Sequence, residues 1–163
     1  MTETRTLALA VDRTRAYTRY YLKHLHGTDP HRVFELNGAK LNSAHWIVAH
    51  LTVTQNWLLL RSTDGPFEKF SWAKHFNLGS VPPAAELCPP FEEVQAMFAH
   101  VHEKALAHVA TLTTEQLDQP HTGAVSIAGI VQRRDAVIHH LRHENLHTGQ
   151  LAWLCKLNGV KTV

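Results

Sequence analysis

Four long segments of this chain carry apolar residues at the three- and four-residue spacing of an α-helix. They cover approximately residues 4–26, 42–62, 91–111 and 126–158. No segment shows the sustained alternation of apolar and polar residues that predicts a β-strand. The 163 residues are enough for one compact core and too few for two. The sequence therefore predicts a single all-α domain, residues 1–163, folded as a four-helix bundle.

Glycines, prolines and capping residues predict where these helices end. Gly65 closes the second segment, Gly159 follows the fourth, and Ser126 is the expected N-cap of the fourth. Residues 113–117 predict a short capped helix before the last long one. The connection over residues 67–90 is rich in prolines and aromatic residues. Its length suits a crossover along the bundle between the second and third helices, or a loop over one end of it.

Composition excludes several classes of partner. Lys and Arg number 16 against 14 Asp and Glu, a net charge of +2, and no basic run or basic-aromatic stripe favours nucleic acid. No stretch approaches the roughly 18 apolar residues of a membrane span. The N-terminus lacks the apolar core of a signal peptide. Cys88 and Cys155 have no CxxC spacing and form no disulfide framework, so a cytoplasmic location is expected.

Two histidines near the C-terminus, His143 and His147, lie four residues apart in the last predicted helix. Their imidazoles leave the same helix face one turn apart, which is how a helix offers two nitrogen ligands to one divalent metal. On the second helix, His50 shares a face with Trp46 and Trp57 and is expected to point inward. Burying imidazoles without partners costs about 1–3 kcal/mol each, and a shared cation satisfies them together. We therefore expect a three-histidine metal site with an open fourth position.

Other interpretations of these histidines remain open. A single inward histidine is more often a hydrogen-bonded core residue than a ligand. A fourth donor, such as His139 or His100, would close the site and make the ion structural. A di-iron carboxylate site needs two Glu-x-x-His motifs. The chain has one, Glu144 to His147, and residues 42–62 contain no acidic residue, so that chemistry is not expected.

The sequence Asn-Ser-Ala-His-Trp-Ile-Val-Ala-His-Leu at residues 42–51, with His-x-x-x-His-x-Gly-Gln at residues 143–150, resembles the DinB/YfiT-like family of metalloenzymes. The resemblance implies the metal ligands His50, His143 and His147. It also implies an up-up-down-down bundle, a bound zinc or nickel ion, and a homodimer. One departure is Thr148, where the family often has a basic residue, and this position is expected to affect what the mouth of the pocket accepts.

A water on an ion held by three neutral imidazoles ionises near neutral pH, and the same position can hold a thiolate. Some members of the resembled family use small cellular thiols. The expected function is a small-thiol-dependent S-transferase or a metal-assisted hydrolase on a small molecule. The alternative is a non-catalytic, metal-binding stress-response bundle. Gln150 either orients a ligand or substrate or makes a capping or interhelical hydrogen bond. Glu144 is either an acid/base group or, the favoured interpretation, a solvated carboxylate on the helix surface.

Overall fold

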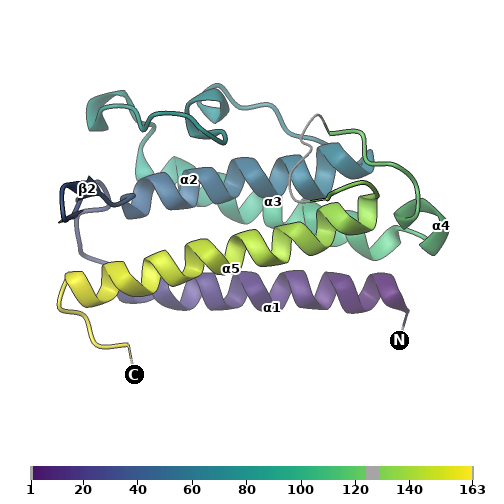
Figure 1. The fold of residues 1–163 in the computed structure, drawn as a ribbon, viewed down its shortest axis with the longest axis horizontal. Helices are drawn as coiled ribbons and strands as arrows, with labels where there is room; N and C mark the ends of the chain where they lie inside the picture. The colour runs from purple at the N-terminus through teal and green to yellow at the C-terminus, as the bar shows by residue number, and fades with distance from the viewer. Residues whose placement is uncertain (1, 124–128, 163) are drawn as a thin grey trace.

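The computed structural model describes residues 2–123 and 129–162, and within them four long helices lie side by side (Figure 1). The all-α prediction is confirmed. The only strands in the described residues form one small antiparallel hairpin. The helices are α1 (Glu3–His24), α2 (Ala44–Gln55), α3 (Phe91–Thr111), the short α4 (Thr114–Leu117) and α5 (Arg133–Leu157), and the strands are β1 (Glu35–Leu36) and β2 (Ala39–Lys40). None of these helices is long and apolar enough to cross a membrane.

Helix α2 continues beyond Gln55 through a π-helical turn, Asn56–Leu60, and a 3₁₀ turn, Arg61–Thr63. Together, α2 and these two turns therefore end close to residue 62, where the sequence predicted the end of the second helix. Asp64 stops it, because its φ of 59° is left-handed and cannot continue a right-handed helix. The π-helical turn adds a residue to one turn and so shifts which side chains face the core beyond it.

Side chains cap several helix starts. Thr2 and Ser43 accept hydrogen bonds from backbone N–H groups in the first turns of α1 and α2, and Thr113 forms the predicted capping box of α4. Helix α5 starts at Arg133 with Gln132 as its N-cap, later than the predicted start near Ser126, which lies outside the described residues. The later start has a local cause, since Gly129 has a left-handed φ of 78° that no helix residue adopts.

The helices run in an up-down-down-up order, which differs from the expected up-up-down-down order (Figure 1). Helices α1 and α5 are parallel, because Glu3 pairs with Arg134 at one end and Thr18 bonds Thr148 further along both. Helices α2 and α3 run together in the opposite direction. Consecutive parallel helices need a connection as long as the bundle. The connection after α2 is long enough to return along the bundle, and so α2 and α3 are the parallel pair.

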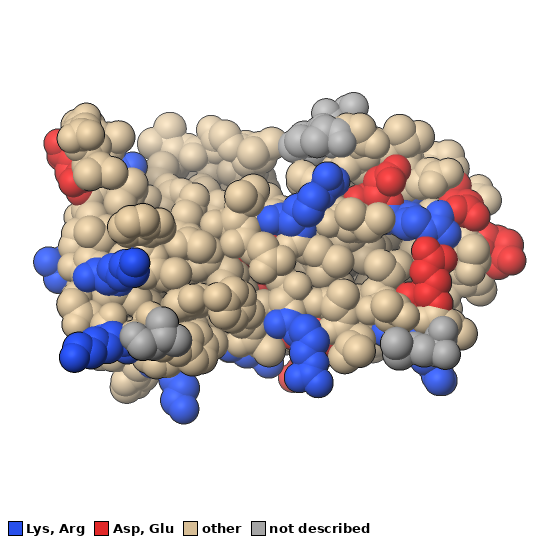
Figure 2. All heavy atoms as spheres, turned by 60° about the horizontal axis from the view of Figure 1, so that its bottom comes forward, with Lys and Arg blue, Asp and Glu red and all other residues tan. Residues whose placement is uncertain are grey.

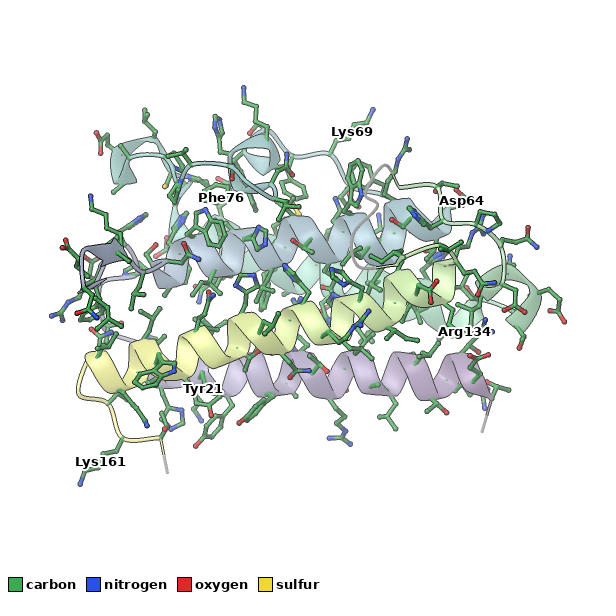
Figure 3. The ribbon with its side chains drawn as sticks, in the orientation of Figure 1. Tyr21, Asp64, Lys69, Phe76, Arg134 and Lys161 are labelled. Atoms are coloured by element: carbon green, nitrogen blue, oxygen red, sulfur yellow. The ribbon has the colours of Figure 1, made fainter. Side chains whose placement is uncertain are left out.

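The connection between α2 and α3 is a crossover that runs back along the bundle over α2 (Figure 1). It contains two short 3₁₀ turns, Ala73–Phe76 and Ala85–Leu87. Trp72 and Phe76 are buried and join the apolar core. Figure 3 shows Phe76 between the crossover and α2. Burying two aromatic side chains stabilises this docking by several kcal/mol and holds the crossover in a defined place.

Acidic and basic side chains are both present on the face shown in Figure 2. Most of the acidic groups on this face lie towards one end of the molecule and a further group lies at the opposite end, while most of the basic groups are separated by uncharged surface rather than arranged in one stripe. The near balance of charge found in the sequence is therefore also spread over this face.

Candidate metal centre

The structure brings together His50 of α2 and His143 and His147 of α5. One ring nitrogen of each lies within 4.8 Å of the other two. The closest pair is His50 Nε2 and His143 Nε2, at 3.1 Å. His50 is only 3% exposed, and the other two rings are half-buried. The antiparallel packing of α2 against α5 thus produces the triad that the helical spacing predicted.

The orientation of the His50 ring is set by the crossover. Its Nδ1–H donates a hydrogen bond of 2.7 Å to the carbonyl oxygen of Phe76. The proton is therefore on Nδ1, and the lone pair of Nε2 points to the other two imidazoles. The indole of Trp46 stacks on the ring, with centroids 4.6 Å apart and planes 11° from parallel. Sequence reasoning missed the role of Phe76, because a backbone carbonyl has no signature in the sequence.

The His147 ring is oriented in the same way by Gln150. Its Nδ1–H donates a hydrogen bond of 3.0 Å to Gln150 Oε1, which leaves Nε2 free. His143 differs, because its Nδ1 is buried and has no hydrogen-bond partner among residues 2–123 and 129–162. Its Nε2 lies 3.1 Å from His50 Nε2, and a hydrogen bond between these two atoms would leave the lone pair of His147 Nε2 without a donor. A shared cation would satisfy the converging nitrogens of all three rings together. Gln150 is thus in contact with one of the three histidines, within the same helix.

Burial lowers the pKa of all three histidines. The pKa of His50 falls to about 4 and that of His143 to about 3, first through desolvation and then through the neighbouring imidazoles. The pKa of His147 is also lowered by burial. All three rings are therefore neutral at pH 7, and neutral imidazole is the form that binds metals.

A cavity of about 350 Å³ opens beside the triad. Its walls are mostly apolar and come from α2, from the crossover and from α5. They include His50, Val53, Thr54, Trp57, Leu58, Asn77, Leu78, His139 and His143. The His139 ring is 6.0 Å from that of His143 and outside the group of converging nitrogens. His100 instead bonds Glu68, so neither proposed fourth donor joins the triad.

The structure corrects the interpretation of Glu144. Its side chain is fully buried rather than solvated, and it faces α1. Arg15 binds both carboxylate oxygens, at 2.7 and 3.1 Å, and Thr18 donates a third hydrogen bond at 2.9 Å. These bonds lower its pKa to about 2, with the charge of Arg15 the largest favourable cause against the opposing effect of burial. Glu144 therefore stays ionised and is not an acid/base group of the cavity.

Thr148 also differs from its expected role at the pocket mouth. It is 1% exposed, and its hydroxyl lies 2.7 Å from that of Thr18 on α1. Residues 144 and 148 are each one position beyond a triad histidine. The turn of about 100° per residue on a helix therefore directs them to a different neighbour. Thr148 packs between α1 and α5 and does not line the cavity described above.

Two further buried histidines, His102 and His140, lie close to the ion pair of Arg15 and Glu144. The Gln55 amide donates to both rings, at 3.2 and 3.4 Å. Desolvation, with a contribution from the Arg15 charge, lowers each pKa from 6.5 to about 4. Between pH 6.5 and pH 4, these two histidines therefore bind protons in the unfolded chain and not in the native state. The free energy of unfolding is therefore expected to be highest above pH 6.5 and to fall as the pH drops towards 4.

The measurement is chemical denaturation across this pH range, for the wild type and His102→Asn. Between pH 6.5 and pH 4.5, the free energy of unfolding of the wild type is expected to fall by at least about 1 kcal/mol more than that of the variant. The reason is that one pKa unit corresponds to about 1.4 kcal/mol. His75→Asn is the matched control, because His75 is exposed. If the free energy of unfolding had the same pH dependence in the wild type and in His102→Asn, the lowered pKa of His102 would be contradicted.

A helical bundle that directs three neutral imidazoles to one point beside a cavity is a candidate metal-binding protein of the four-helix class. The sequence profile of the DinB superfamily matches residues 10–151. The match spans most of α1 and reaches into α5, and it includes all three histidines. The chain belongs to the DinB superfamily. Comparison with curated proteins gave no match.

Proposed function

We propose that this protein is a metal-dependent enzyme in which His50, His143 and His147 hold one divalent ion, zinc or nickel. The observation that carries the proposal is the convergence of three imidazole nitrogens within 4.8 Å of one another. Two of the rings have their other nitrogen engaged by a hydrogen-bond acceptor, the arrangement usual for metal-bound histidine. Within the described residues the converging set has three members, which favours an open catalytic position over a closed structural site.

When bound, such an ion supplies a Lewis acid that favours the ionised form of a thiol or water. The residues of the chain contribute binding and the exclusion of water. Val53, Leu58 and Leu78 form an apolar wall that suits the hydrocarbon part of a small electrophilic substrate. His139 lines the same cavity, and burial lowers its pKa, so it is neutral at pH 7 and able to accept a proton. We propose His139, rather than Glu144, as the acid/base group of this cavity.

The proposed reaction is transfer of a small thiol to an electrophile, with metal-assisted hydrolysis as the other enzymatic route. The test is a screen of small thiols against electrophilic substrates, and of activated esters without thiol, using zinc- or nickel-loaded protein. Metal-free protein and His147→Ala are the controls. Activity that needs both metal and thiol supports the transferase, and thiol-independent ester cleavage supports the hydrolase. Tight metal binding without either activity would favour the non-catalytic alternative.

Three further predictions accompany this function. A homodimer fits the exposed apolar side chains Leu146 and Trp153 on α5 and Leu36 on the hairpin, which are 71%, 63% and 63% exposed. A surface of this kind suits contact between two copies of the chain. The single-domain organisation over residues 1–163 and the cytoplasmic location stay predictions.

A further inference from the structure

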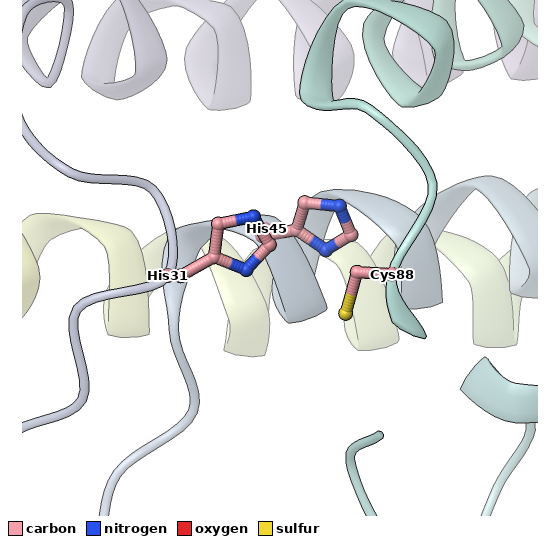
Figure 4. A group of neighbouring side chains, drawn as sticks. All are labelled: His31, His45 and Cys88. Carbon is pink, nitrogen blue, oxygen red and sulfur yellow. The ribbon is translucent and has the colours of Figure 1, made fainter. Parts of the chain in front are cut away.

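A second group of metal-binding side chains lies outside the triad and is formed by His31, His45 and Cys88 (Figure 4). One donor atom of each is within 4.8 Å of the other two. The two imidazoles stack with their centroids 4.4 Å apart. The three residues come from separate parts of the chain. His31 lies between α1 and β1, His45 in the first turn of α2, and Cys88 near the end of the crossover.

His45 is already arranged as a ligand. It is 1% exposed, and its Nε2–H donates a hydrogen bond of 2.9 Å to the carbonyl oxygen of Pro89. Because the proton is on Nε2, the lone pair is on Nδ1, which makes no hydrogen bond to this carbonyl. Its backbone N–H bonds the carbonyl of Pro30, so the residue is held at both ends. A buried imidazole whose proton is anchored by a backbone carbonyl is typical of metal-bound histidine.

Cys88 is available to bind a cation. It is half-buried and forms no disulfide, and the polar contacts of its sulfur within the described part of the chain are long ones, at 3.6 and 3.9 Å, with the carbonyls of Ala84 and Pro83. In Figure 4 the thiol lies beside the two rings. A cavity of about 500 Å³, lined by all three residues, leaves room for a further ligand.

We propose that His31, His45 and Cys88 form a second metal site that binds zinc, with a water from the adjoining cavity as the fourth ligand. One thiolate and two imidazoles form a donor set that zinc prefers. Binding replaces the S–H bond of Cys88 with a sulfur–zinc bond, and the proton goes to solvent. The ion ties the end of the crossover to α2 and to the connection after α1. Phe76 lies between the two sites, with its ring 5.8 Å from His45 and its carbonyl on His50.

The sulfur ligand separates this site from the triad, which contains only nitrogen donors. The test uses Co²⁺ as a probe for the metal-free wild type, because a cobalt–thiolate bond gives a near-ultraviolet charge-transfer band. We expect the band in the wild type and in His143→Ala, and its loss in Cys88→Ser. Cys155→Ser is the matched control, since Cys155 is the other free cysteine and is buried away from the site. It is expected to keep the band.

A second pair of variants tests the histidines without altering the buried His45. His31→Ala is expected to weaken cobalt binding, followed by the intensity of the band, by at least about 10-fold. Losing a residue that only hydrogen-bonds to a metal ligand already has an effect of this size. His75→Ala is the control, because His75 is exposed on the same crossover. Zinc should also protect Cys88 from alkylation in the wild type and in His143→Ala. No band at saturating cobalt in the wild type, or a band that persists in Cys88→Ser, overturns the proposal. Neither result bears on the triad.

Discussion

His143→Ala is expected to abolish metal binding at the triad. His143 provides the nitrogen closest to His50, and its loss leaves two imidazoles for an ion that needs at least three protein ligands. The measurement is elemental analysis after dialysis of protein prepared without a histidine tag. It is best made in a Cys88→Ser background, which removes the thiolate of the second proposed site. That parent is expected to retain one ion per chain, and the His143→Ala variant none.

Thermal or chemical unfolding provides an independent readout of the same prediction. A ligand that binds only the native state stabilises it by about 4 kcal/mol when its free concentration is on the order of 1,000 times its Kd. Added zinc or nickel should therefore raise the unfolding midpoint of the parent and not that of His143→Ala. Unchanged midpoints in both proteins, with a metal-free parent, would contradict the metal site.

Two neighbours of the triad serve as graded controls. His139→Ala should retain the ion, since His139 lines the cavity but lies outside the converging group. Gln150→Ala should weaken metal binding by roughly 10–100-fold, because it removes the hydrogen bond that orients His147 without removing a ligand. If His139→Ala lost the ion as completely as His143→Ala, the identity of the ligands would need to be reassigned.

Arg15→Met is expected to destabilise the fold by about 3–5 kcal/mol, because it leaves the carboxylate of Glu144 buried and unpaired. Both side chains are fully buried. The guanidinium of Arg15 also donates to Gln55 Oε1 and to the carbonyl of Phe98, at 2.8 and 3.0 Å. The measurement is denaturant unfolding followed by circular dichroism, with the slope of the transition checked against the wild type.

A double variant and a surface pair make this prediction specific. Arg15→Met combined with Glu144→Gln should lose less stability than the sum of the two single changes, because no unpaired charge remains. Arg134→Met is the control. Arg134 pairs with Glu3 on the surface between the same two helices, α1 and α5, and an exposed pair contributes at most about 1 kcal/mol. Equal losses for Arg15→Met and Arg134→Met would show that the buried pair has no special role.

The two predictions differ in how far the sequence anticipated them. His143 and His147 share a helix face because of their spacing, which is a local property of the chain. His50 followed from the apolar residues around it on α2. Glu144 was misplaced, because periodicity shows that a residue is inward only when its neighbours on that face are apolar. Its partners are instead polar groups of α1, from a distant part of the sequence.

The sequence by itself determined the long helices, the length of the crossover and the shared helix face of His143 and His147, since spacing, breakers and residue type are local and act within a few turns. Only the tertiary structure decided the up-down-down-up order, the burial of Glu144 against Arg15, and the meeting of His31, His45 and Cys88. Each of these depends on which helix faces or loops come into contact. That choice is made by the packing of the whole core, in which a residue's partners lie far away along the chain.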